Sequence, residues 1–371
     1  LGIENTSNQL TPVAVSGISN ASQVLAGGNH TCAILSNGTM KCWGNPEMSG
    51  RLGDGTTDGF APVTVIGVTN AVEISSGSQH TCARISDGTV KCWGGMYKGD
   101  GTWNYIGATP AQIQGISGAV QLSSPGLRGA CARLSNGSLK CWGRGYNNAF
   151  GLGHVNGSNV PVSVPGVSGV IFAGSGIYYG ACAVLSGGSV KCWGSARHTW
   201  LGDGNDIFSG RSGLPVSVSG LSNVTQIVTG WDHSCALISG GSAKCWGNNG
   251  YGQLGDNSKT SSATPVSVSG LSGVSELTAG IDFTCARLSD GTAKCWGRAQ
   301  YGRLGNDNDT TDQLTPVSVS GLTGATKISS RGRSACAIVG GNAVMCWGRN
   351  DVGQLGSTDT YDRLTPIQAG E

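Results

Sequence analysis

The segment at residues 30–45, HTCAILSNGTMKCWGN, contains most of the information about the fold. It has two cysteines, Cys32 and Cys42, with a Ser-Asn-Gly turn between them at residues 36–38. A three-residue loop that ends in glycine is typical of a β-hairpin with a type I turn and a left-handed bulge. That register places Cys32 opposite Cys42 in a non-hydrogen-bonded pair, where opposed Cα atoms lie about 4.5 Å apart. A disulfide accepts this spacing, so we predict a bond across the hairpin.

The same hairpin recurs along the chain. The fourteen cysteines form seven pairs of identical spacing, and successive pairs start 49 to 53 residues apart. The predicted pairs are Cys32 with Cys42, Cys82 with Cys92, Cys131 with Cys141, Cys182 with Cys192, Cys235 with Cys245, Cys285 with Cys295, and Cys336 with Cys346. Each second cysteine is followed by Trp-Gly. Because a feature that occurs in every repeat serves the fold rather than one site, we predict that these tryptophans pack between repeats.

Two further segments accompany each hairpin in a fixed order. A small apolar segment such as residues 24–26 precedes the hairpin, and a Pro-Val segment such as residues 62–65 separates it from the next copy. We designate the apolar strand A, the hairpin strands B and C, and the Pro-Val strand D. Proline cannot donate to a central ladder, so strand D is expected at the outer edge of a four-stranded antiparallel sheet. Strand A suits the crowded centre of a ring.

The segments at residues 30–45 and 233–256 (HSCALISGGSAKCWGNNGYGQLGD) resemble the regulator of chromosome condensation repeat. The similarity covers nearly the whole chain in seven copies, and it implies an all-β, seven-bladed β-propeller that forms one domain over residues 1–371. The nuclear founding member of that family exchanges nucleotide on the small GTPase Ran through a wedge inserted in one blade. No comparable insertion is found here, so we do not expect that activity. The paired cysteines are similar to those of secreted bacterial relatives.

The outer strand of blade seven has two candidates. Eight Pro-containing D segments accompany seven hairpins, and residues 12–15 compete with residues 366–368 for one place. The remaining segment would be a fifth strand, a linker, or an edge that pairs with a neighbouring molecule, because unpaired edges invite strand addition. Self-assembly through a terminal strand is therefore one hypothesis.

Composition and charge exclude several classes of partner. The net charge of +2 comes from 23 basic and 21 acidic residues that are scattered, so no nucleic-acid binding is expected. No apolar run reaches the roughly 20 residues that span a bilayer, so we expect no membrane insertion. The first ten residues lack the features of a signal peptide, and we expect a soluble chain whose export signal has been removed. The paired cysteines predict an oxidising compartment, and hence a secreted or cell-surface protein.

The binding face is predicted from variation among the repeats. Connections alternate between the two faces of an up-and-down ring, so the A–B and C–D loops share one face. The B–C turns are nearly uniform, whereas the A–B and C–D loops differ and carry Trp, Tyr and Arg, which dominate interface hot spots. The predicted partner-binding residues are Tyr97, Trp103, Arg128, Tyr178, Tyr179, Trp200, Trp231, Asp232, Asp282, Phe283, Arg331 and Arg333. Tyr105 lies in the same set of loops, and we expect Tyr251 and Tyr301 to pack under their own glycine-rich loops.

No catalytic or metal-binding constellation is found in the sequence. His30, His80 and His233 share one repeat position and are expected to be structural, and His154 and His198 lie in no triad or metal-spaced cluster. Cys-x9-Cys lacks the short spacing of zinc sites. The loops at residues 54–58 and 306–312 lack the glycine and distal glutamate of an EF-hand, so we expect Asx turns there. We therefore predict no cofactor, no metal and no enzymatic activity.

These observations favour a non-enzymatic extracellular recognition or adhesion module, which holds a protein or a glycan at a cell surface through its A–B/C–D loop face. One alternative is a secreted enzyme inhibitor resembling the β-lactamase inhibitory protein II, which is similar in fold. Another is a structural subunit of an extracellular fibre, joined through the surplus D segment. A lyase-type enzyme ranks last because propeller enzymes need a charged or metal-bearing central site.

Overall fold

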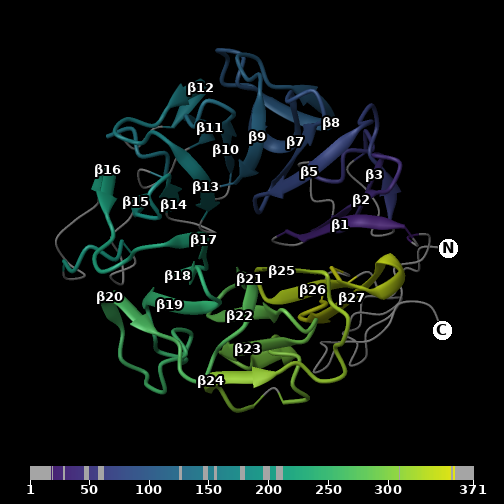
Figure 1. Ribbon diagram of the computed structural model, residues 1–371. Helices are drawn as coiled ribbons and strands as arrows, with labels where there is room; N and C mark the ends of the chain where they lie inside the picture. The colour runs from purple at the N-terminus through teal and green to yellow at the C-terminus, as the bar shows by residue number, and fades with distance from the viewer. Residues whose placement is uncertain are drawn as a thin grey trace.

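The computed structural model describes residues 18, 20–27, 30–45, 50–56, 62–124, 128–144, 149–153, 157–175, 180–194, 201–205, 212–308, 310–351 and 354–355. Seven antiparallel sheets surround a central axis in chain order (Figure 1). Six sheets have four strands, and in the seventh the described residues form three. Among these residues, no helix is long and apolar enough to cross a bilayer. The predicted all-β seven-bladed propeller is confirmed.

The strands follow the predicted A-B-C-D order from the axis outward in six blades, and the described strands of blade seven follow the order A-B-C. The A strands are β1 (Ala21–Ala26), β5 (Ala71–Ser76), β9 (Ala119–Ser123), β13 (Val170–Ser175), β17 (Val224–Thr229), β21 (Val274–Ala279) and β25 (Lys327–Arg331). The B strands are β2 (His30–Leu35), β6 (His80–Ile85), β10 (Arg128–Leu134), β14 (Gly180–Leu185), β18 (His233–Ile238), β22 (Phe283–Leu288) and β26 (Ser334–Val339). The C strands are β3 (Met40–Gly44), β7 (Val90–Tyr97), β11 (Leu139–Arg144), β15 (Val190–Gly194), β19 (Ser242–Gly247), β23 (Ala293–Gly297) and β27 (Ala343–Gly348).

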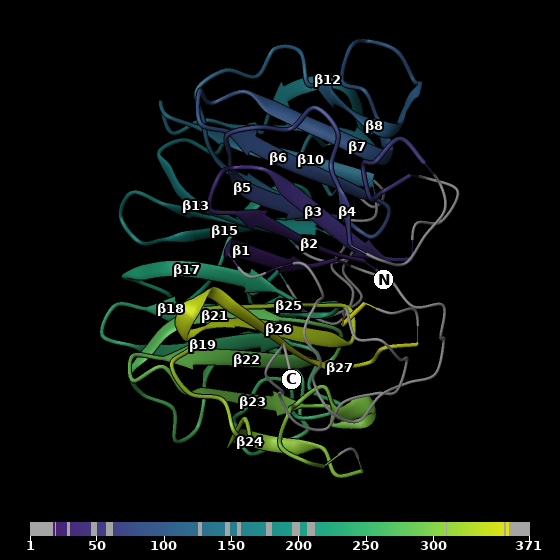
Figure 2. The same cartoon turned by 90° about the vertical axis from the view of Figure 1, so that its right-hand side faces the viewer.

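The Pro-Val segments form the outer edges, as proline requires. The D strands are β4 (Val63–Thr64), β8 (Tyr105–Gln112), β12 (Ser158–Ser163), β16 (Ser212–Ser217), β20 (Ser262–Ser267) and β24 (Gln313–Ser318). Viewed from the side, the blades stack around the axis as separate twisted sheets (Figure 2). Both candidates for the outer strand of blade seven, residues 12–15 and 366–368, lie outside the described residues. Short 3-10 turns occur at η3 (Gln300–Gly302) and η4 (Gly340–Asn342).

Each blade contains the predicted disulfide across its B–C hairpin. In the first blade Ile34 pairs with Met40 and Cys32 with Cys42, in the register that the turn predicts. All seven cystines join directly opposed residues whose Cα atoms lie 4.0 to 4.1 Å apart.

The observed bonds confirm every predicted cysteine pair. They join Cys32 to Cys42, Cys82 to Cys92, Cys131 to Cys141, Cys182 to Cys192, Cys235 to Cys245, Cys285 to Cys295, and Cys336 to Cys346. The chain has no free cysteine. Each hairpin is therefore crosslinked within itself, and no disulfide joins one blade to another.

The hydrophobic core lies between blades. One buried cluster combines Cys245 and Leu254 of the fifth blade with Leu277 and Trp296 of the sixth. The ring closes in the same way, because Ile338 of blade seven lies in one cluster with residues of the first blade. All seven tryptophans that follow a second cysteine are fully buried. Their predicted role in packing between blades is confirmed.

Some of these indoles have a polar as well as an apolar connection to the preceding blade. Trp93 donates its Nε1–H to the carbonyl of Arg51 at 2.8 Å, and Trp296 donates to the carbonyl of Gln253 at 2.9 Å. A glycine lies against the ring: a Cβ on Gly255 would approach Trp296 Nε1 to 2.8 Å, and its φ is +72°. The C–D loop must therefore have glycine here for two reasons, its backbone conformation and the adjacent ring.

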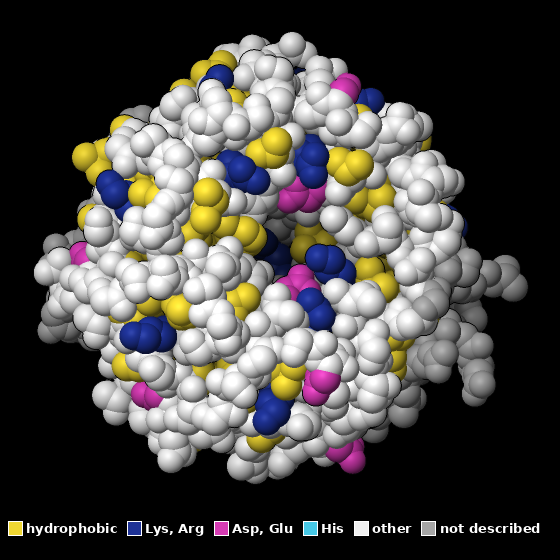
Figure 3. All heavy atoms as spheres, in the orientation of Figure 1, with side chains coloured by type: hydrophobic (Ala, Val, Ile, Leu, Met, Phe, Trp, Pro, Cys, Tyr) yellow, Lys and Arg dark blue, Asp and Glu magenta, His cyan; other side chains and the backbone are white. Residues whose placement is uncertain are grey.

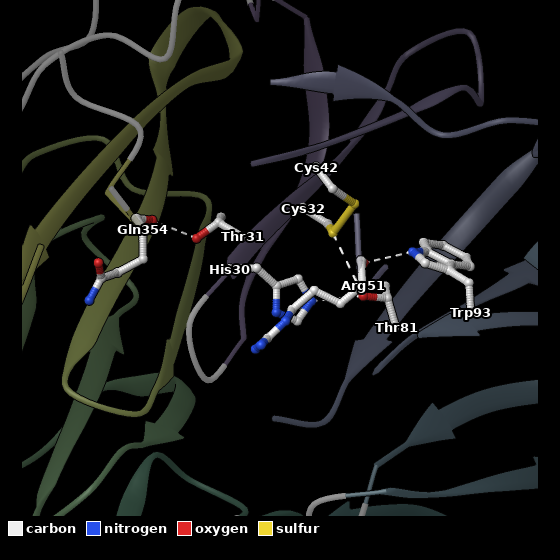
Figure 4. The surroundings of a disulfide bond; sticks show 8 residues. All are labelled: His30, Thr31, Cys32, Cys42, Arg51, Thr81, Trp93 and Gln354. Atoms are coloured by element: carbon white, nitrogen blue, oxygen red, sulfur yellow. Dashed lines mark hydrogen bonds between the residues drawn. A yellow bond between two sulfur atoms is a disulfide. The ribbon is translucent and has the colours of Figure 1, made fainter. Parts of the chain in front are cut away.

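The histidines that begin strand B form a second connection between blades (Figure 4). His30 Nε2 lies 2.7 Å from Thr81 Oγ1, which donates to the carbonyl of Arg51 at 3.2 Å. A threonine hydroxyl has one hydrogen, so Nε2–H must donate to it. His233 repeats the arrangement with Thr284 at 2.8 Å. Burial lowers the pKa of His233 to about 4, so its imidazole stays neutral near pH 7. The expected structural role of these histidines is supported by these bonds.

The innermost strands are joined by side chains rather than by a backbone ladder. Gln226 accepts from the N–H of Leu277 at 2.8 Å and donates to its carbonyl at 3.1 Å, and Gln121 does the same with Ala173. A carboxylate replaces the amide in two blades. Glu73 accepts from the N–H of Leu122 at 3.1 Å. Its other oxygen accepts from Arg84, the residue opposite it on strand B, at 2.7 Å.

We predict that Gly255→Ala destabilises the ring more than Gly270→Ala does. Both glycines have positive φ, but a Cβ at Gly270 meets nothing within 4 Å, whereas one at Gly255 meets Trp296. The difference between the two variants should be about 1–3 kcal/mol, the usual cost of overpacking. Urea unfolding followed by tryptophan fluorescence measures it. Equal losses would show that the contact with Trp296 does not carry the effect.

We predict that acidification weakens the His233 connection. The folded-state pKa of about 4 lies below the unfolded value of 6.5, so the unfolded chain binds the proton more readily. Stability from this group is therefore complete above pH 6.5 and falls toward pH 4, by up to about 1.4 kcal/mol per pH unit. In the next blade Phe283 and Ala335 replace this pair and lie in one buried cluster. The double variant His233→Phe/Thr284→Ala should reduce the pH dependence of the urea midpoint between pH 7.5 and 5, and an unchanged slope would contradict the assignment.

Candidate recognition site on the variable loop face

Blade two has an aromatic cluster where strands β7 and β8 extend beyond their counterparts. Tyr97 and Tyr105 are register partners at the end of this pair. Their rings stack with centroids 5.2 Å apart, and Trp103 meets Tyr97 edge to face at 5.0 Å. The guanidinium of Arg128 lies 5.2 Å from the centre of the Tyr105 ring. We call Tyr97, Trp103, Tyr105 and Arg128 the aromatic cluster.

Local hydrogen bonds fix the aromatic cluster in place. Arg128 donates to the hydroxyl of Tyr105 at 2.5 Å and to the side-chain carbonyl of Gln79. The turn that carries Trp103 is an Asx turn, in which Asp100 accepts from the backbone N–H of Thr102 at 2.9 Å and from its hydroxyl at 2.6 Å. The first residue of strand β10 in blade three, Arg128, thus contacts and fixes the C–D hairpin of blade two. The predicted residues Tyr97, Trp103 and Arg128 are brought together.

The aromatic cluster is exposed as well as fixed. Trp103 retains 54% of its accessible surface and Tyr105 retains 45%, the highest values among the aromatic side chains that the structure describes as exposed. Large apolar side chains that remain exposed and close together are typical of interaction sites. This part of the loop face therefore has the form of a contact surface rather than of a covered loop.

A second group of predicted residues gathers at blades six and seven. Asp282, in a left-handed conformation with φ of 61°, accepts from Arg298 at 3.2 Å. The guanidinium of Arg298 covers the Tyr251 ring at 4.4 Å. Arg333 lies 5.5 Å from the centre of the Tyr301 ring. Tyr251 and Tyr301 remain partly exposed, and the ring of each lies against an arginine of the following blade.

The centre of the ring is hollowed, and charged side chains gather around the opening that Figure 3 shows. A cavity of about 210 Å³ is lined by residues of all seven A strands. Arg331 reaches across it from blade seven and donates to the carbonyl of Ser124 in blade three at 3.2 Å. Hydroxyl pairs line its wall, with Ser75 and Ser124 at 2.7 Å and Thr278 and Ser330 at 2.9 Å. Arg331 therefore lies at the axis rather than on an outer loop.

The other predicted residues have different outcomes. Trp231 and Asp232 form a partly exposed A–B turn of blade five. Tyr178, Tyr179 and Trp200 lie outside the described residues.

The prediction that Phe283 contacts a partner is wrong for the described conformation, because its side chain is 0% exposed. It begins strand β22, in the repeat position that His30, His80 and His233 occupy, rather than lying in the preceding loop. The Thr-Cys that follows each of His30, His80 and Phe283 is the signal that could have placed it.

Sequence reasoning missed the arginines that complete the second group. Arg298 and Arg349 each follow a Trp-Gly, and Arg303 precedes a Leu-Gly. The repeat places these arginines in the C–D loops, but the prediction considered only the tyrosines of those loops. Contact between Arg349 and Tyr301 joins loops of neighbouring blades, which no local pattern reveals.

The acidic loops form the predicted Asx turns where they are described. Asp54 accepts from the N–H of Thr56 at 3.2 Å, and Asn308 accepts from the N–H of Thr310 at 2.9 Å. Within the described part of the chain, no three His, Cys, Asp or Glu residues are grouped as metal ligands would be.

Solved structures share this architecture at low sequence identity. The yeast RCC1 protein Prp20, in its crystal structure with Kap60, matches with a TM-score of 0.77 and 19% identity over 100% of this chain and 89% of that chain. Human WBSCR16 matches with a TM-score of 0.75 and 21% identity over 89% and 95%. The CRINKLY WD40 ectodomain of the Arabidopsis thaliana receptor kinase ACR4 gives 0.51 and 17% identity over 89% and 96%. These likenesses concern the fold alone.

Family models identify the repeat itself. Two models of the regulator of chromosome condensation (RCC1) repeat match, one at residues 22–48, 71–100, 224–253 and 274–303, the other at residues 187–237, 241–287 and 290–338. Together the matches cover more than half of the sequence, and they include every cystine hairpin except that of blade three, in whole or in part. The chain therefore belongs to the regulator of chromosome condensation (RCC1) repeat family.

Proposed function

We propose that this chain is an extracellular recognition module that binds a protein partner through its A–B/C–D loop face and catalyses no reaction. The observation that carries the proposal is the aromatic cluster, in which Trp103 and Tyr105 are exposed and yet held in one arrangement. Propellers of this family commonly bind proteins, and the loop face is where the blades differ from one another.

The energetics of the aromatic cluster favour binding. Trp, Tyr and Arg are enriched among interface residues that cost about 2 kcal/mol or more when truncated. Ordering a mobile side chain on binding costs about 0.5–1.5 kcal/mol. Stacking with Tyr97 and the bond from Arg128 to Tyr105 meet much of that cost before a partner arrives. A partner that covers Trp103 and Tyr105 would therefore gain burial of apolar surface with little loss of conformational freedom.

The disulfides support the extracellular location that we propose. Seven intramolecular disulfides indicate an oxidising environment, since such bonds are rare where thiols are kept reduced. The ectodomain of the receptor kinase ACR4 has a similar fold. Secretion of this chain, or its display at a cell surface, belongs to the proposal on these grounds.

Adhesion to a protein and inhibition of a secreted enzyme would use the same face. The identity of the captured protein distinguishes them, because an inhibitor would reduce the activity of an enzyme that it binds. The β-lactamase inhibitory protein II resembles this chain in fold, so activity assays of a panel of β-lactamases with the purified chain added test the inhibitor alternative. Glycan binding is a separate outcome, and a glycan array tests it directly.

We predict that Trp103→Ala/Tyr105→Ala weakens partner capture at least about tenfold, the effect of losing roughly 1.4 kcal/mol. The immobilised chain is exposed to the extracellular proteins of its source organism, and bound proteins are quantified by mass spectrometry. The matched control is Ile66→Ala/Ile171→Ala, since these residues are 52% and 45% exposed and do not belong to the aromatic cluster or to the second group of residues at blades six and seven. Circular dichroism verifies that each variant folds.

Capture of the same protein by the wild type and the control, with loss in the aromatic variant, supports the site. Equal capture by all three, or equal loss in both variants, would overturn it.

A further inference from the structure

Three guanidinium groups surround one tyrosine ring on the loop face. The carbon centres of Arg303, Arg333 and Arg349 lie 5.6, 5.5 and 5.5 Å from the centre of the Tyr301 ring. They come from the C–D loop of blade six, the A–B loop of blade seven and the C–D loop of blade seven. Tyr301 itself has a φ of 68°, a left-handed conformation that a side chain this bulky rarely adopts. We call these four residues the arginine cluster.

Positive charge in and beside the arginine cluster exceeds the negative charge near it. Arg298 is paired with Asp282 and Arg349 with Asp351. The side chain of Arg333 has no hydrogen bond or ion pair within the described part of the chain. Four arginines, counting Arg303, thus face two carboxylates.

Arg303 adds a positive charge from the buried side of the arginine cluster. Its side chain is fully buried, and it donates to the carbonyls of Gln300 and Ile281, each at 2.7 Å. Its Nη2 has no partner among the described residues. Burial lowers the pKa of Arg303 to about 10, and the charges of Arg298 and Arg333 act in the same direction. Arg303 therefore stays charged near pH 7. Because the protein interior screens charge less than water does, its positive charge still attracts an anion at the surface.

Arg333 and Arg349 are accessible, unlike Arg303. The Arg349 side chain is 32% exposed, and Arg333 is partly exposed. The backbone N–H of Arg349 donates to the carbonyl of Arg333 at 3.0 Å, so the two loops that carry them are tied together. Guanidinium groups bind carboxylates through parallel hydrogen bonds, and partial burial strengthens such pairs.

We propose that Arg333 and Arg349, placed on either loop beside Tyr301, bind an aspartate or glutamate side chain of the protein partner. This inference rests on the proposed function and assigns a second contact on the same face. In Figure 1 the strands β7 and β8 beside the aromatic cluster and the strands β23 and β24 of blade six lie on opposite sides of the ring. A partner that touches both would cover the central opening.

The test uses fluorescein-labelled hexaglutamate as the probe and fluorescence anisotropy at low ionic strength as the measurement. Wild type should bind it, and hexaglutamine should not bind. Arg333→Gln should weaken binding, because it removes charge without leaving a described carboxylate unpaired. Arg333→Gln/Arg349→Gln should weaken it at least about tenfold. The control Lys140→Gln/Lys191→Gln removes the same net charge from strands β11 and β15 of blades three and four, and should leave binding within about twofold.

Three results of the anisotropy assay would overturn the inference: no binding of hexaglutamate to the wild type, an equal loss in the lysine control, or displacement by inorganic phosphate but not by acetate, which would assign the site to phosphate. The aromatic variant separates the two proposals. Trp103→Ala/Tyr105→Ala should still bind hexaglutamate as the wild type does, whether or not it captures a partner. If the arginine variants lose hexaglutamate binding but capture the partner as the wild type does, the partner does not use the carboxylate site. That result would reject this inference and leave the proposed function standing.

Discussion

In each blade, one tryptophan packs against the preceding blade, and the ring depends on this contact. No backbone ladder joins neighbouring sheets in the part of the chain that the structure describes. Side-chain packing therefore holds the blades together, with single backbone bonds such as that from the N–H of Ala71 to the carbonyl of Gly38 at 2.9 Å. Each indole fills the space between two sheets, and at Trp93, Trp193 and Trp296 its N–H also donates to a C–D loop carbonyl. That carbonyl can also accept from a B-strand threonine, as Gln253 does from Thr284 at 3.1 Å. Burying an aromatic ring and pairing its polar atom at once gives an apolar interface with a fixed register.

The disulfides have a different task. Each one joins residues that already oppose each other within a hairpin, so it stiffens a blade and leaves the contacts between blades to packing. Stiff blades keep their loops at fixed positions. This explains how Arg128 of blade three can brace Tyr105 of blade two, and how Arg333 and Arg349 of blade seven can meet Tyr301 of blade six. The two candidate binding clusters both form where loops of adjacent blades touch.

Most of the fold could be predicted from the sequence because its determinants are local and repeated. The register that joins Cys32 to Cys42 follows from a three-residue turn, and the outer position of strand D follows from the missing N–H of proline. The candidate site was predicted only in part. Tyr97, Trp103 and Arg128 were found because they differ from their counterparts, but their mutual contacts depend on the angle between blades. Phe283 was placed wrongly because its variation was taken as a sign of exposure, although it reflects an exchange of a buried histidine for a buried phenylalanine.

The side-chain bonds between inner strands limit which residues can be exchanged between blades of this ring. A glutamine such as Gln226 offers its neighbour one acceptor and one donor, like a peptide group, and needs nothing else. A glutamate such as Glu276 offers acceptors alone, so its remaining charge is met by Arg287 directly across the sheet. The two residues therefore form a unit: a blade that contained the glutamate without the arginine opposite it would leave an unpaired carboxylate between the inner strands. Recombination of whole blades preserves that pairing, whereas recombination inside a blade would break it.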